Sequence, residues 1–253
     1  MATKPVTKEL CPYNKQEDPI MVKSLSALSI VFLLAAPMLS AGVVLWDQAP
    51  ATAGVSLTSQ VFTDYPDFSS YLVMDVTVPA SGWTIESVTT YFKAGTFFAD
   101  SGYTLPVQLV ILPVSGDLPD ASADPSTATQ YDGVYSFSGD LARIDVEGLD
   151  ITLAPGDYWI GVSPYAAADY EGQFYLLSSS STVGRSAAWR DPGGGFGFGT
   201  DWIPTTTVKE SFTEGNLHIE GTLNDVPEPS TMGCLALALI VGGGLRRRAR
   251  KNR

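Results

Sequence analysis

Between residues 42 and 225 the apolar positions repeat every second residue, and Gly or Pro interrupts the pattern about every ten residues. Residues 72–78 alternate in this way, whereas residues 107–112 are apolar on both faces, as in a central strand. Further candidate strands span residues 56–62, 83–93, 134–137, 148–153, 157–163, 173–179, 186–190 and 217–223. No stretch has a helical period. We therefore predict an all-β fold, a single antiparallel β-sandwich of jelly-roll-like type.

The first 41 residues have a different pattern. Residues 1–20 are polar and lack periodicity, whereas Lys23 precedes an apolar run at 25–39 and small residues at 40–42. This order is typical of an export signal, so we assign residues 21–41 to a signal peptide that the Sec machinery and signal peptidase would process. A signal anchor or a buried helix is the alternative. Translation could start at Met1 or at Met21.

The last 28 residues combine three unlike elements. Pro227, Glu228 and Pro229 hold the backbone extended, and an apolar stretch follows at 232–245. Its 14 residues would form a helix about 21 Å long, shorter than the roughly 30 Å hydrocarbon layer. The basic tip is predicted to stop translocation and to stay on the cytoplasmic side of the inner membrane, through Arg246, Arg247, Arg248 and Arg250. We therefore expect a short C-terminal transmembrane helix.

These elements, found in residues 226–253 behind an export signal, resemble the PEP-CTERM sorting signal of Gram-negative bacteria. The resemblance implies recognition by an exosortase, a membrane-embedded enzyme, with cleavage near the Pro-Glu-Pro segment. It also implies release or attachment at the outer surface, or in the extracellular matrix, of an exopolysaccharide-producing, biofilm-forming cell. An ordinary single-pass tail anchor is the alternative.

The body has an acidic composition. Residues 42–226 contain five Lys or Arg against 23 Asp or Glu, a net charge near −18. Such a surface repels phosphate backbones, which argues against nucleic-acid binding. Both cysteines, Cys11 and Cys234, lie outside the body, so it has no internal disulfide and no cysteine-based metal site.

Aromatic residues supply the candidates for glycan binding. The segment 153–162 places a Pro-Gly turn before an aromatic-rich strand, and it looks like a strand that recurs in the β-sandwich bodies of PEP-CTERM proteins. Its Trp159 reads more readily as core packing than as a sugar platform. The glycine-rich run 191–200 predicts a long loop, whose Phe196 and Phe198 either form an exposed apolar lip or fold back over the body. The candidate sugar-stacking residues are Trp83, Trp159, Trp189 and Trp202.

The sequence gives little support for a catalytic function. The only histidine, His218, is expected to point outward beside Glu220 on its strand, as an exposed residue rather than a base or metal ligand. The segment around Ser163 lacks the last glycine of the Gly-x-Ser-x-Gly motif, so it does not match a nucleophile elbow. The densest carboxylate groups are Asp64 with Asp67, and Asp145 with Glu147 and Asp150; calcium is one ion that they could bind, although solvated surface acidity explains them better.

We therefore predict a non-enzymatic, exported protein without a cofactor or metal, which serves as a surface or biofilm-matrix component after exosortase sorting. Exopolysaccharide is a further expected partner. The first alternative is a carbohydrate-binding module on the cell surface. The second is a polysaccharide-cleaving enzyme with a carboxylate pair in a groove.

Overall fold

The computed structural model describes residues 42–94, 103–114 and 116–224. The predicted N-terminal extension (1–20), signal peptide (21–41) and sorting signal (226–253) lie outside these ranges. Within the described ranges, no helix has the length and apolarity needed to cross a membrane.

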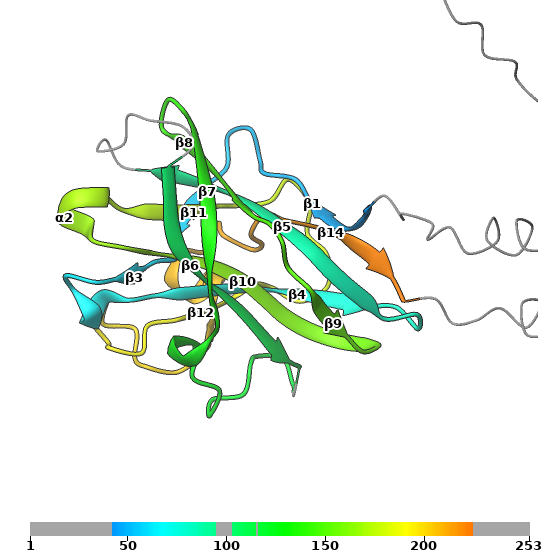
Figure 1. Cartoon of the computed structure of the whole chain (residues 1–253). Coiled ribbons are helices and arrows are strands. Elements are labelled where there is room, and N and C mark those ends of the chain that lie inside the picture. Colours follow the sequence, from blue (N-terminus) through cyan, green and yellow to red (C-terminus); the bar gives the residue numbers. More distant parts are fainter. Residues whose placement is uncertain (1–41, 95–102, 115, 225–253) are drawn as a thin grey trace, which may run out of the picture. The chain divides into compact units, whose positions relative to one another are not determined.

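Strands account for nearly all of the described secondary structure (Figure 1). They are β1 (Val43–Gln48), β2 (Ser56–Thr58), β3 (Val61–Phe62), β4 (Tyr71–Val78), β5 (Trp83–Ala94), β6 (Tyr103–Pro113), β7 (Gln130–Ser138), β8 (Leu141–Val146), β9 (Ile151–Leu153), β10 (Gly156–Ala166), β11 (Phe174–Leu177), β12 (Ala188–Arg190), β13 (Ile203–Pro204) and β14 (Leu217–Leu223). The short helices are η2 (Pro66–Phe68), η3 (Pro125–Thr127), α2 (Ala168–Glu171) and α3 (Thr205–Val208).

The strands are joined by hydrogen bonds in the order β1-β14-β5-β8-β7-β6-β10-β4-β12-β13. Off this path, β11 pairs with β2 and β5, β9 with β5, and β3 with β10. The β3–β10 pair is parallel, and the pairs along the main path are antiparallel. The prediction of a mostly antiparallel β-fold is confirmed. A division into two facing sheets, and jelly-roll connectivity, stay predictions.

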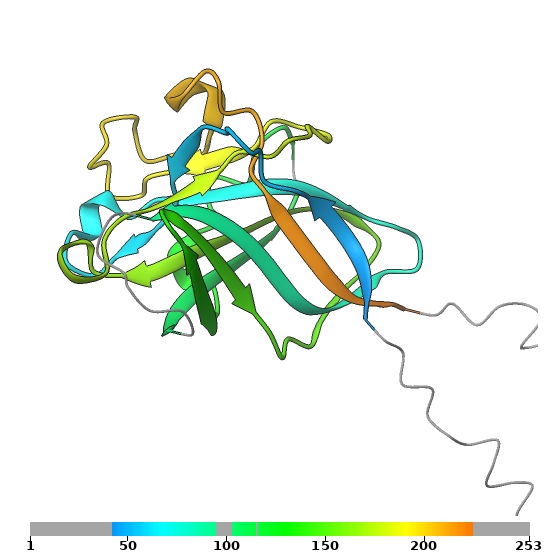
Figure 2. The ribbon, with the colours of Figure 1, turned by 90° about the horizontal axis from the view of Figure 1, so that it is seen from above.

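The central strands are buried on both faces. Along β4, Leu72 and Met74 belong to a large hydrophobic cluster, whereas Tyr71 and Val73 belong to a smaller one. Because successive side chains of a strand point to opposite faces, the two clusters lie on the two sides of this strand. Figure 2 shows that the sheet is strongly curved, with β1 and β14 side by side at one edge.

The alternating pattern located most of these strands. The predicted run 217–223 coincides with β14, and the run 83–93 falls one residue short of β5. The run 56–62 is two short strands, β2 and β3, because residues 59 and 60 leave the ladder. Three strands, β1, β8 and β13, have no counterpart among the predicted ones.

Candidate functional site

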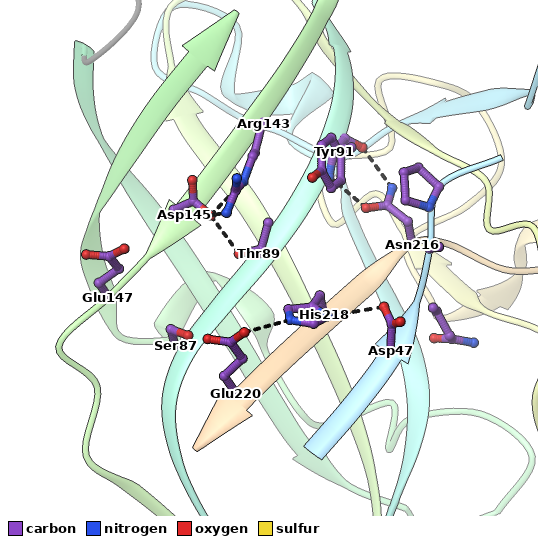
Figure 3. Close-up of a pocket in the computed structure, with 13 residues that line it drawn as sticks. Asp47, Ser87, Thr89, Tyr91, Arg143, Asp145, Glu147, Asn216, His218 and Glu220 are labelled. Carbon is purple, nitrogen blue, oxygen red and sulfur yellow. Dashed lines mark hydrogen bonds and ion pairs between the residues drawn. The ribbon is translucent and has the colours of Figure 1, made fainter. Parts of the chain in front are cut away.

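A polar cleft of about 270 Å³ lies on the face of β1, β14, β5 and β8 that points away from the main core (Figure 3). Strand alternation builds it. On β14 the side chains of Leu217 and Ile219 are fully buried, so His218 and Glu220 point to the opposite face. The lining residues are Asp47, Gln48, Ala49, Pro50, Ser87, Thr89, Tyr91, Arg143, Asp145, Glu147, Asn216, His218 and Glu220.

His218 is held between two carboxylates. Its Nδ1 lies 3.1 Å from Oδ1 of Asp47 on β1, and its Nε2 lies 3.1 Å from Oε1 of Glu220. Burial by itself lowers the pKa of His218, but the hydrogen bonds to Glu220 and Asp47 outweigh it, so the net shift of the pKa is upward. The ring therefore links β14 to β1 through Asp47, its cross-strand neighbour.

A second polar group occupies the β5–β8 side of the cleft. Oδ1 of Asp145 accepts hydrogen bonds from Thr89 Oγ1 at 2.6 Å and from Arg143 Nε at 3.0 Å. The Arg143 guanidinium also forms an ion pair with the same oxygen at 2.8 Å. Figure 3 shows this group and the His218 group facing the cleft from opposite sides. Asp145 is thus already neutralised by a cation from its own strand.

Beneath these groups, buried amides fix the cleft floor. Asn216 donates to the backbone oxygens of Tyr91 and Leu177 at 2.8 Å each, and its Oδ1 accepts from Tyr91 N at 2.7 Å. Gln48 is 1 % exposed, and its Oε1 accepts from Trp46 Nε1 at 3.0 Å. Among the described atoms, Gln48 Nε2 has no acceptor. Hydrogen bonds to Tyr91 on β5 and to Leu177 on β11 therefore hold the Asn216 side chain in place.

The cleft is lined mainly by carboxylates and other polar groups. It brings together the carboxylates of Asp47, Asp145, Glu147 and Glu220, against the single guanidinium of Arg143. Nevertheless, no three His, Cys, Asp or Glu side chains in the described ranges are arranged to hold a metal ion. At about 270 Å³ the cleft lies just below the usual size range of small-molecule sites, so it would accept one small polar group.

The structure corrects the proposal of sugar-stacking tryptophans. Trp83, Trp159, Trp189 and Trp202 are 2 %, 0 %, 1 % and 4 % exposed, respectively. Trp83 on β5 and Trp189 on β12 belong to the large hydrophobic cluster. Trp159 on β10 and Trp202, which precedes β13, belong to the smaller one. None of the four presents a ring face to a sugar. The core-packing interpretation of Trp159 agrees with its burial.

The glycine-rich loop folds back over the body. The buried carboxylate of Asp191 accepts from Gly194 N at 3.0 Å and from Phe196 N at 2.7 Å, and Gly195 N donates to Asp67 O at 2.9 Å. The rings of Phe196 and Phe198 meet Trp189 edge-on at 5.7 and 6.0 Å. Phe196 and Phe198 nevertheless remain 36 % and 44 % exposed. The loop thus folds back over the body, and its two phenylalanines still present a partly exposed apolar surface.

The remaining candidate residues of the sequence analysis lie in several different parts of the chain. Asp64 caps α2, because its carboxylate accepts from Ala168 N at 3.0 Å and Asp169 N at 2.9 Å. Ser163 is buried, and its hydroxyl bonds to Ser59 rather than facing a substrate. Asp145 and Glu147 line the cleft, whereas Asp150 does not. The sorting residues Pro227, Glu228, Pro229 and Arg246, Arg247, Arg248 and Arg250 lie outside the described residues.

Two buried carboxyl groups were not anticipated. Glu214, 1 % exposed, and Asp75, 6 % exposed, each have one carboxyl oxygen without a hydrogen-bond partner among the described atoms. Burial and the nearby charge of Asp75 raise the pKa of Glu214 to about 9. Burial also raises the pKa of Asp75, although Arg185, which donates its backbone N–H at 2.8 Å, acts in the opposite direction. Nothing in the pattern around residue 214 distinguishes this glutamate from a surface one.

Comparison with known proteins concerns the segment that follows β14. The family model of the PEP-CTERM protein-sorting motif matches residues 225–248. No curated protein matches the chain, and no solved structure does so either. The chain therefore carries a PEP-CTERM sorting motif directly behind a β-rich body, as the three-part C-terminus predicted. The motif marks an exported, membrane-transiting protein of Gram-negative bacteria, with an exosortase as its processing partner.

Proposed function

We propose that this protein is a surface or extracellular-matrix component that an exosortase sorts after export. The observation that carries the proposal is the sorting motif at residues 225–248, which begins immediately after Asn224, the last described residue. The acidic body supports it, because a net charge near −18 keeps an exported domain soluble and separate from anionic lipids. A biofilm that contains exopolysaccharide is the setting that we propose for it.

A non-enzymatic role without cofactor or metal is part of this proposal. Both ring nitrogens of His218 are bound to carboxylates, which leaves neither as the partner of a serine nucleophile. Ser163, the serine that the sequence analysis considered as a nucleophile, is buried and bonds to Ser59. The carboxylate of Asp145, which belongs to one of the densest carboxylate groups of the sequence, is tied to Arg143 and Thr89. The proposed role of the body is therefore structural.

Intact mass spectrometry of the protein recovered from exosortase-containing cells and from cells lacking the enzyme tests the sorting function. With the enzyme, we expect surface-fractionated protein that has lost residues 1–41 and the tail beyond the Pro-Glu-Pro segment. Replacement of Pro227, Glu228 and Pro229 by alanine should leave the basic tip in place, whereas the control Glu210→Ala, at an exposed body residue, should be processed normally. Full-length cytosolic protein in cells that contain the enzyme would refute the proposal.

The polar cleft favours a second candidate function, binding of a small glycan at the cell surface. The carboxylates of Asp47, Glu147 and Glu220 line the cleft, and carboxylate oxygens accept hydrogen bonds from the hydroxyl groups of a saccharide. This site differs from the tryptophan faces that the sequence suggested. A glycan array probed with the wild type and with Glu220→Gln is the test. Signals that are absent, or that the substitution leaves unchanged, would remove this function.

A further inference from the structure

Both ends of the described chain leave the body at the same place. β1 pairs antiparallel with β14, with Val43 opposite Gly221, so the start of one strand lies beside the end of the other. The end of β14 also pairs with the beginning of β5, with Leu223 opposite Trp83. The helix α2 lies near the far end of β10, which begins opposite Val78 and runs for 11 residues, or about 36 Å. Figures 1 and 2 show these two ends of the body.

The exit of the C-terminal segment is fixed. Thr84 Oγ1 donates to Oδ1 of Asn224 at 2.8 Å, and Asn224 N donates to Gly82 O at 3.2 Å. Upstream, the register of the β14–β5 pair shifts between Glu220 and Gly221. A side chain at Gly221 would collide with the carbonyl oxygen of Thr84, so the strand passes this point in close contact with β5. The chain cannot slide outward without breaking these contacts.

The tether between this exit and the sorting signal is short. Pro227 is the third residue after Asn224, so even a fully extended chain separates them by no more than about 11 Å. Met232, where the apolar stretch begins, is the eighth residue, within about 29 Å. An enzyme that binds the Pro-Glu-Pro segment in its active site must therefore approach this end of the body to within a few side-chain lengths.

Exposed aliphatic side chains surround the exit. Val43, Val44 and Leu223 are 45 %, 56 % and 50 % exposed, although each belongs to a paired strand. Because Val43 and Val44 are successive residues of the edge strand β1, the three side chains border both faces of the β1–β14 edge. We call these three residues the exit patch. Glu86 and Glu220, both exposed, lie beside it on β5 and β14. An apolar patch with an acidic border suits a protein surface better than anionic lipid headgroups.

We propose that the exit patch is the surface through which the body contacts the exosortase while the sorting motif occupies the active site. The contact rests on the proposed sorting function, and it extends recognition from the motif to the folded body. Its occupant is the enzyme because the tether holds Pro227 within about 11 Å of Asn224, the residue that follows Leu223, whichever way the chain turns. The body would thereby orient the peptide that enters the enzyme.

Site-specific photo-cross-linking of the full chain in exosortase-containing cells tests the contact. A photoreactive residue at Leu223 should cross-link to the enzyme, whereas the same residue at Tyr170 on α2, 80 % exposed, should not. Insertion of 20 Gly/Ser residues between Asn224 and Asp225 adds roughly 25 Å of average reach. It should abolish the Leu223 cross-link while cleavage, read by intact mass, continues.

The outcomes separate the patch from the sorting function. If the wild-type chain keeps its tail in these cells, both the sorting function and the proposed contact through the exit patch are refuted. If the chain is cleaved but Leu223 cross-links no better than Tyr170, only to lipid, or equally well with the insertion, the patch alone is refuted. Unchanged melting temperatures of the Leu223 and Tyr170 variants show that a lost cross-link does not come from unfolding.

Discussion

At the scale of single residues, Glu214 makes stability depend on pH. Its carboxyl group is buried, and its pKa is raised from 4.5 to about 9. Between these values the unfolded chain is deprotonated at residue 214 while the folded chain keeps the proton. The free energy of unfolding should therefore fall with rising pH, by at most about 1.4 kcal/mol per unit from this group.

The substitution Glu214→Gln should remove this slope, because an amide does not titrate. Urea unfolding at pH 5, 6.5 and 8 measures it, and the wild type should lose more stability across the series than the variant. Glu210→Gln, at an exposed position, is the matched control and should keep the wild-type slope. If the free energy of unfolding changed equally with pH in the wild type and in Glu214→Gln, Glu214 would be ionised in the folded state.

His218 should contribute to stability in the acidic range. Its folded-state pKa is raised above 6.5 by Glu220 and Asp47, so its stabilisation is complete below pH 6.5 and is lost as the pH rises through the folded-state value. His218→Gln should therefore lower the melting temperature at pH 5.5 and leave it nearly unchanged at pH 8.5. The effect should be about 1 kcal/mol or less, because both carboxylates are substantially exposed. A pH-independent loss would point to packing instead.

The residues of the cleft were only partly predictable. Alternation along 217–223 placed His218 outward beside Glu220, and the structure confirms this orientation. Asp47 was missed because it lies on β1, a strand that begins at Val43, shortly after the predicted signal peptide, and was not itself predicted. Pairing between β1 and β14 joins residues 171 positions apart. A period of two fixes a side chain's face, but it carries no information about the neighbouring strand.

At the scale of elements, the loop that follows β12 depends on one buried carboxylate. Asp191 is fully buried and accepts the backbone N–H groups of Gly194 and Phe196. Asp191→Ala would leave both donors without their partner and should destabilise the protein by about 2 kcal/mol or more. It should also alter the fluorescence of Trp189, which contacts Phe196 and Phe198.

Asp201, exposed on the same segment, offers a matched control, and Asp201→Ala should change neither property. Urea denaturation followed by tryptophan fluorescence gives both readouts. An Asp191→Ala variant as stable as Asp201→Ala would mean that the glycine-rich segment holds its shape without the carboxylate.

The pattern recovered the long strands β4 and β6, although both are buried on two faces, and it missed β1, β8 and β13. β8 shows Ala142, Ile144 and Val146 inward, and this signal could have located it. β13 has two residues, too few for any period. Burial of the tryptophans depends on packing on both faces of the curved sheet, which the alternation of a single strand does not report.

At the scale of the whole molecule, charge is the dominant property. Five cations cannot neutralise 23 carboxylates in residues 42–226, and the ion pairs that do form are mostly exposed, such as Lys93 with Asp140. Self-repulsion of this size destabilises a compact state. Two agents could relieve it: screening by mobile salt, or an ion held at a specific site.

The two agents give different melting curves. Since no metal-holding cluster occurs among the described residues, general screening should account for the effect. Raising NaCl from 10 mM to 100 mM shortens the Debye length from about 30 to about 10 Å, so the melting temperature should rise by several degrees. At constant ionic strength, millimolar calcium and a chelator should give the same value. A higher melting temperature in calcium than in chelator would instead require a specific site, and the acidic loops would then be the first place to search for it.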